Sequence, residues 1–183
     1  LEADAGPVLV DFPDDAPADP PGAEADMEGM ACPIPMSAPP EDEDENDLGV
    51  ALEHEIERLS PWYDLSVEKR GRTTVGISGL DIVDAARYIF AILQDTGTAS
   101  PRADLSPGET LKLACEDLRA YYLEAATTQP GRTTIEERDD WFWNDTTAGK
   151  VFWALKPVLV ASGDAMMQAM GNYILVPRAQ LGS

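Results

Sequence analysis

The first 47 residues of this chain contain no lysine and no arginine, although they include 15 of its 34 acidic residues. They also contain nine of the 15 prolines, and proline fixes φ and removes a backbone donor. A segment with so much charge of one sign cannot bury enough apolar surface to offset the entropy of ordering. We therefore predict that residues 1–47 form an acidic, Pro-rich arm that is extended or disordered, and that residues 48–183 form a helical domain.

The net charge of −21 is divided unevenly along the chain. Residues 1–60 contain 18 acidic residues and one arginine, whereas residues 61–183 contain 16 acidic and 12 basic residues. This distribution argues against direct binding of nucleic acid or of anionic membranes, because both depend on clustered Lys and Arg. It favours a basic protein surface as the partner, and a solubilising or spacer role is the alternative.

Cysteine and histidine are scarce. Cys32 and Cys115 form no CxxC pair, so we expect two free thiols, with one disulfide as the alternative. The single histidine, His54, has no second ligand at metal-site spacing. No apolar run approaches the roughly 20 residues of a membrane span. The sequence thus predicts no metal, no cofactor and a cytoplasmic location; because the first residue is Leu1, a removed leader is the alternative.

Two apolar islands, Val8–Phe12 and Met30–Met36, interrupt the arm. Short apolar segments in a charged, Pro-rich context are typical of docking motifs, and docking onto the chain's own body is the alternative. The residues predicted to bind a partner are Val8, Leu9, Val10, Phe12, Met30, Ile34 and Met36. The residues predicted to face its basic surface are the acidic run Glu41, Asp42, Glu43, Asp44 and Glu45.

After residue 47, apolar residues recur at the three- and four-residue spacing of helices. A first helix is predicted over 48–59 with Ser60-Pro61 as its stop, and Ser78 is predicted to cap a second. Ser106, followed by Glu109 three residues later, predicts a capping box. Arg72–Ile77 has strand character but no obvious neighbour. The aromatic-rich 134–157 is predicted to be helical until Pro157 kinks or ends it, and Gly163-Asp164 to begin the last helix. Together these segments predict an all-α orthogonal bundle of four to five helices.

The tetrapeptide Gly-Arg-Thr-Thr occurs at 71–74 and again at 131–134. The flanking residues do not match in type or pattern, so we predict no internal repeat.

Region 136–153 combines carboxylates with tryptophans and is the best candidate for chemistry. A carboxyl group beside an indole can acquire a raised pKa and act as a general acid. The alternative interpretation is an acidic helix start followed by core aromatics. The candidate pocket residues are Asp139, Asp140, Trp141, Trp143 and Asp145.

No glycine-rich phosphate loop and no GxSxG elbow is present in the sequence. Charge and pattern predict a non-enzymatic interaction protein, such as an accessory subunit, an assembly factor or an inhibitor. Its acidic arm would bind a basic partner. The alternatives are a helical enzyme or small-ligand binder that uses region 136–153, and an inhibitor that mimics nucleic acid.

Overall fold

The computed structural model describes residues 48–131 and 134–181, and it is all-α over these ranges. The helices in chain order are α1 (Leu48–Arg70), α2 (Ile82–Gln94), α3 (Pro107–Ala126), α4 (Ile135–Asp145), α5 (Thr147–Val160) and α6 (Ala165–Ala169). A π-helical turn, η3 (Met170–Ile174), and a 3-10 turn, η4 (Arg178–Leu181), follow. The all-α prediction is confirmed for the described part, although it holds six α-helices rather than four or five.

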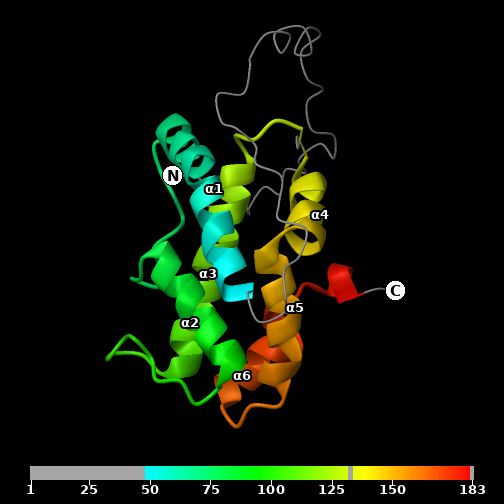
Figure 1. Ribbon diagram of the computed structural model, residues 1–183. Helices are drawn as coiled ribbons and strands as arrows, with labels where there is room; N and C mark the ends of the chain where they lie inside the picture. The colour runs from blue at the N-terminus through cyan, green and yellow to red at the C-terminus, as the bar shows by residue number, and fades with distance from the viewer. Residues whose placement is uncertain (1–47, 132–133, 182–183) are drawn as a thin grey trace, which may run out of the picture. The chain divides into compact units, whose positions relative to one another are not determined.

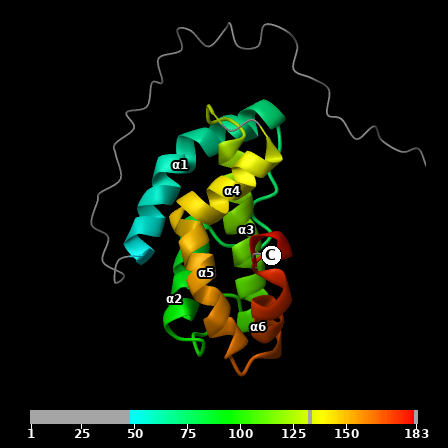
Figure 2. The ribbon, with the colours of Figure 1, turned by 90° about the vertical axis from the view of Figure 1, so that its right-hand side faces the viewer.

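Helix α3 is central to the packing. It contacts α1, α2, α4 and α6, and α5 in turn contacts α1, α2 and α4. In both views α4 lies toward one end of the helical body and α6 toward the other, with α5 running between them (Figures 1 and 2). One continuous core joins the helices, and its largest buried side chains are Trp143, Tyr122, Phe142, Phe152, Leu52, Ile56 and Ile89.

The first helix is longer than the sequence predicts. Pro61 lies inside α1 instead of ending it, so the predicted stop at Ser60-Pro61 is wrong. Proline removes one backbone donor from a helix, and tertiary contacts can offset that loss. The Tyr121 hydroxyl donates to the carbonyl oxygen of Ile56 at 3.0 Å, and the Thr128 hydroxyl donates to that of Trp62 at 2.7 Å. The chain from Tyr121 to Thr128 thus bonds to the α1 backbone on both sides of its proline.

The segment between α1 and α2 is a loop, so the strand character of Arg72–Ile77 was misleading. Asp81, not Ser78, caps α2, because its carboxylate accepts from the backbone N–H of Val83. Ser78 is instead buried, and its hydroxyl accepts from the N–H of Leu80.

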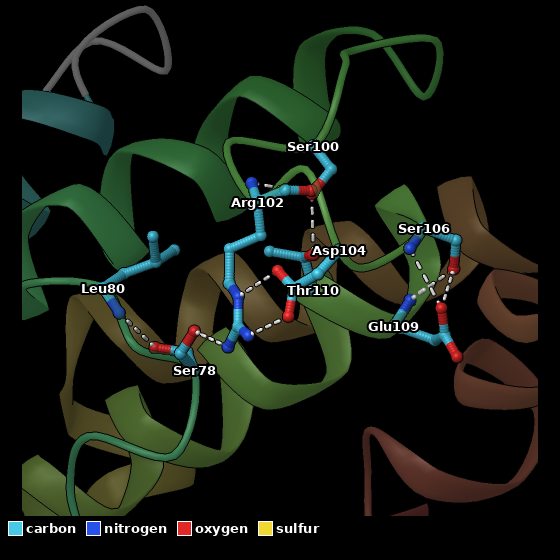
Figure 3. Close-up of polar contacts among 8 residues, drawn as sticks. All are labelled: Ser78, Leu80, Ser100, Arg102, Asp104, Ser106, Glu109 and Thr110. Carbon is cyan, nitrogen blue, oxygen red and sulfur yellow. Dashed lines mark hydrogen bonds and ion pairs between the residues drawn. The ribbon is translucent and has the colours of Figure 1, made fainter.

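A polar cluster joins the loop before α2 to the loop before α3 (Figure 3). Arg102 donates through Nη1 to the carbonyl oxygen of Ser78 at 2.7 Å and pairs with Asp104. Ser100 accepts from the N–H of Arg102 and bonds to the Thr110 hydroxyl of α3 at 2.8 Å. These bonds fix the long α2–α3 connection to the first turn of α3.

The capping box of Ser106 and Glu109 is confirmed at the start of α3, with both reciprocal bonds formed (Figure 3). Farther along, the aromatic-rich region divides into α4 and α5 at Thr146, a break that the sequence pattern did not reveal. The Thr146 hydroxyl donates to the carbonyl oxygen of Phe142 at 2.6 Å and accepts from the N–H of Gly149 at 3.0 Å. One side chain thus ends α4 and caps α5.

The end of the helical body follows the prediction more closely. Asp164 caps α6, as Gly163-Asp164 indicated. Pro157 lies within the last turn of α5, which ends three residues later at Val160.

Candidate functional site

The arm residues that the sequence singled out lie outside the described residues. These are the two islands at 8–12 and 30–36, the acidic run at 41–45, and Cys32. Cys115 is described, and it is a buried free thiol whose pKa is raised by burial and by the neighbouring charge of Glu116. His54 is exposed on α1.

The structure does not bring the candidate pocket residues of region 136–153 together around one cavity. Trp143 is 2% exposed and belongs to the core, and Trp141 packs beside Tyr122 with ring centroids 6.1 Å apart. The Asp139 carboxylate accepts from Arg119 Nη2 at 2.7 Å, whereas Asp140 and Asp145 are exposed to solvent. Of these five residues, only Asp139 lines a cavity on the outer side of α3.

That cavity is an open groove of about 530 Å³, which we call the α3 groove. The end of α1, the outer face of α3 and the first turns of α4 form its walls. It is lined by Arg70, Thr74, Glu116, Arg119, Ala120, Leu123, Glu124, Thr127, Ile135, Arg138 and Asp139.

Two buried carboxylates of α3 hold the loop between α1 and α2, of which Thr74 lines the groove. Asp117 Oδ1 accepts from the N–H groups of Gly76 and Ile77, at 2.7 and 3.0 Å, and its Oδ2 accepts from Ser78 N–H at 2.9 Å. Successive backbone N–H groups that converge in this way form an anion-binding nest, which Asp117 fills here. In a β-strand these backbone N–H groups would donate to a neighbouring strand. In this loop they donate to the carboxylate of Asp117 on α3.

Glu124, one heptad after Asp117, holds the preceding part of the loop. Its carboxylate accepts from the Thr74 N–H at 2.8 Å, from the Thr74 hydroxyl at 2.7 Å and from the Thr73 hydroxyl at 2.9 Å. Burial raises the pKa of Glu124, but these hydrogen bonds and the Arg70 charge outweigh burial, so the net pKa lies below its usual value.

Arg119 is the basic residue of the groove that lies against the aromatic core. Its guanidinium lies over the ring of Trp143 at 5.5 Å and near that of Phe142 at 6.0 Å, while it pairs with Asp139. Within the described residues, two buried side-chain nitrogen atoms have no hydrogen-bond partner, Arg119 Nε and Trp143 Nε1. Unpartnered buried donors are uncommon in proteins. Here both belong to the Arg119–Trp143 pair, in which the guanidinium lies over the indole ring.

The first of the two Gly-Arg-Thr-Thr segments contributes one lining residue to the groove, and the second precedes the lining residue Ile135 in the sequence. Gly71 follows the end of α1 with φ of +67°, and Gly131 follows the end of α3 with φ of +90°. Thr74, the last residue of the first copy, lines the groove, and Thr134, the last residue of the second, caps α4 just before the lining residue Ile135. Gly71 directly follows the last residue of α1, whereas Gly131 lies five residues beyond the last residue of α3.

A second buried carboxylate site joins α1 to α5. Glu55 is 8% exposed, and its Oε2 accepts from the Tyr122 hydroxyl at 2.8 Å and from the N–H of Thr147 at 2.7 Å. Burial raises the pKa of Glu55, and these hydrogen bonds only partly oppose that effect. Burial and the charge of Glu55 also hold the pKa of Tyr122 well above its usual value. This arrangement anchors the start of α5 and leaves Glu55 inaccessible to a ligand.

Sequence reasoning missed the lining residues Arg70 and Arg119 and the loop anchors Asp117 and Glu124. The one usable signal was the seven-residue spacing of the two acidic residues beside the apolar stripe of α3, which places both on one helix face.

The chain matches no protein-family model, and no curated protein and no solved structure matched it. Within residues 48–131 and 134–181, no three His, Cys, Asp or Glu side chains lie together as a metal ion would require. Among the same residues, no helix is both long and apolar enough to cross a membrane.

Proposed function

We propose that this chain is a non-enzymatic interaction protein, an accessory subunit, assembly factor or inhibitor, whose acidic arm binds a basic surface of a partner protein. The observation that carries the proposal is the charge distribution: 15 acidic residues and no Lys or Arg precede Leu48. Opposite charges speed encounter and select among partners, while apolar contacts slow release.

The composition of the arm indicates which of its segments would make charged contacts and which would make apolar ones. The acidic run 41–45 supplies the densest charge, and the islands 8–12 and 30–36 supply apolar contact. An extended arm keeps both available to a partner, because self-repulsion stretches a chain of one charge sign. The islands' length suits addition of a strand to a sheet edge or insertion of side chains into a groove.

The helical body supports the same proposal through the α3 groove. Its walls combine arginines with apolar side chains, a combination enriched in protein interfaces. A partner that engages both the arm and the body would gain avidity, since the second contact becomes intramolecular.

A second candidate function, binding of a small ligand, is favoured by the size of the same groove. Its volume of about 530 Å³ falls within the range of small-molecule sites, and Asp139 from region 136–153 lines it. An enzyme or small-ligand binder would lose turnover or ligand affinity in Asp139→Asn, whereas binding through the arm would be unchanged.

The test of the proposed function is co-purification from the native source at about 50 and 500 mM salt, with the full chain and with residues 48–183 as baits. A counterion-dependent contact weakens steeply with salt. We expect a basic partner on the full chain that is lost at high salt and recovered far less by residues 48–183. A partner held equally by both baits, or unaffected by salt, contradicts the role of the arm.

A further inference from the structure

We propose that residues 71–79, at the start of the loop between α1 and α2, form a strap that detaches from α3 as one unit while the helices stay folded. Detachment would uncover the acceptor oxygens of Asp117 and Glu124 and remove Thr74 from the lining of the α3 groove. The inference goes beyond the proposed function, because it assigns a closed and an open state to this face of the helical body.

The strap buries little apolar surface. Seven of its nine residues are exposed, whereas Val75 is partly buried and Ser78 is buried. Val75 packs against the core, but Ile77, the other aliphatic side chain of the strap, is 50% exposed. A segment with few buried apolar contacts opens at a lower free energy than the helices of the core. Polar contacts must therefore hold most of the strap in place.

Two carboxylates on one face of α3 supply those polar contacts. Asp117 accepts from three consecutive backbone N–H groups, at 76–78, over distances of 2.7 to 3.0 Å. Glu124 accepts from one N–H and two hydroxyls, at 73–74, over distances of 2.7 to 2.9 Å. A single residue, Val75, joins these two parts of the strap, and one residue spans at most about 3.6 Å. Neither part can move farther than that from α3 while the other stays bound, so the two sets of bonds should break together.

Both ends of the strap are glycines with left-handed backbone conformations. Gly71, with φ of +67°, directly follows α1, and Gly79, with φ of +72°, lies three residues before the first residue of α2. Glycine adopts positive and negative φ with similar ease, so either end can turn without a steric cost. Tyr63 and Arg102 each form one further hydrogen bond with the strap, and these two bonds must also break on detachment.

The test is amide hydrogen exchange of the full chain, followed by NMR at increasing urea concentrations below the unfolding transition. The reporters are Thr74 and residues 76–78 in the strap, and Leu118 and Tyr122 in the buried part of α3. The urea dependence of exchange scales with the surface that the opening exposes. Over about 1 M urea, we expect exchange to change by less than about twofold in the strap and to accelerate by about tenfold or more in the core.

The variant Asp117→Asn tests whether the strap is one unit. It replaces the charged acceptor of three N–H groups by an amide, which weakens each of these bonds. Exchange should accelerate by roughly tenfold or more at 76–78, and equally at Thr74, whose N–H is bonded to Glu124 instead. The reciprocal variant Glu124→Gln should accelerate exchange at 76–78 by a similar factor.

The variant Gly149→Ala provides the control for global unfolding. An added Cβ at this position would meet the carbonyl oxygens of Phe142 and Trp143, at the junction of α4 and α5 and outside the strap. We expect the slowest amides of the core to exchange about a hundredfold faster in this variant, while exchange in the strap changes by less than about twofold.

Each measurement can contradict the inference. Strap amides that accelerate as steeply as the core, with urea or in Gly149→Ala, would show that the strap opens only by global unfolding. Acceleration confined to 76–78 in Asp117→Asn and to Thr74 in Glu124→Gln would show two independent contacts instead of one strap. None of these measurements involves a partner, so a failure of the proposed function leaves them unaffected.

Discussion

At the scale of single residues, two buried glutamates lie in opposite electrostatic situations. Burial dominates at Glu55 and raises its pKa, whereas hydrogen bonds from Thr73 and Thr74 overcome burial at Glu124 and lower its pKa. Both carboxylates accept three hydrogen bonds and lie 3.8 Å from an arginine, so the donors alone do not separate them. The cost of burial decides the direction: it outweighs the hydrogen bonds at Glu55, between α1, α3 and α5, and is outweighed at Glu124, beside the open α3 groove. The ionised form of Glu124 is therefore a stabilising part of the fold.

The variant Glu124→Gln should destabilise the protein at pH 7 by about 1–3 kcal/mol, because the amide is a weaker acceptor and its NH₂ faces donors. A lowered folded-state pKa means that the stabilisation is present above the unfolded value of about 4.3 and is lost as pH falls through the folded value. Urea unfolding at pH 7 and at pH 3.5 measures both effects.

The difference between Glu124→Gln and the natural chain should shrink at pH 3.5, because this pH lies below the unfolded value of about 4.3 and the unfolded chain then takes up a proton at this carboxylate. Glu68→Gln, an exposed change on α1, provides the control and should leave the unfolding free energy within about 0.5 kcal/mol. An equal cost of Glu124→Gln at both pH values would contradict the assignment.

At the scale of elements, features that depend on neighbouring residues were predictable from the sequence. Features that depend on hydrogen bonds from distant residues were not. The capping box of Ser106 and Glu109 depends only on neighbours in the chain, so the pattern identified it. The loop over 72–77 resembled a strand because it is rich in β-branched residues and no neighbour in the sequence indicates another conformation. Its backbone N–H groups bond instead to Asp117, about 40 positions away in the sequence. Pro61 was misjudged for the same reason, since Tyr121 and Thr128 lie far along the chain.

The junction of α4 and α5 depends on the absence of a side chain at Gly149. A Cβ at this position would lie 2.2 Å from the carbonyl oxygen of Phe142 and 3.0 Å from that of Trp143. Backbone atoms cannot move aside as a flexible side chain can, so overpacking should cost about 3 kcal/mol. We expect Gly149→Ala to lower the free energy of unfolding by that amount in urea titrations.

Gly163 provides a matched control for that change. A Cβ there would meet nothing within 4 Å, and the backbone needs no left-handed conformation. Gly163→Ala should leave stability unchanged or raise it by up to about 1 kcal/mol through the unfolded chain. If both alanine variants were equally stable, the close approach of α5 to α4 would be wrong.

At the scale of the whole molecule, the candidate site illustrates how far sequence reasoning extends. Composition identified the charge imbalance, and it placed candidate chemistry in region 136–153, of which Asp139 does line a cavity. The arginines that define the groove come from α1, α3 and α4, and no single window of sequence contains them. Only the packing of those helices brings Arg70 and Arg119 to one place, so a pattern read along the chain could not assemble the groove.

The division into an arm and a helical domain makes a prediction about folding. Residues 48–183 contain 13 basic and 19 acidic residues, a net charge of −6 against −21 for the full chain. Repulsion among like charges destabilises a compact state and is screened by salt.

At about 20 mM salt, residues 48–183 should therefore unfold with a free energy equal to that of the full chain or up to about 1 kcal/mol higher. At about 500 mM salt the two should coincide, as measured by urea titration followed by circular dichroism. Because the core of the described residues is built from residues between Leu52 and Val176, we expect no loss of helix content in the shorter chain. A loss of several kcal/mol at both salt concentrations would instead show that residues 1–47 contribute to the folded core, and the acidic segment would then be a structural element rather than an arm that reaches a partner.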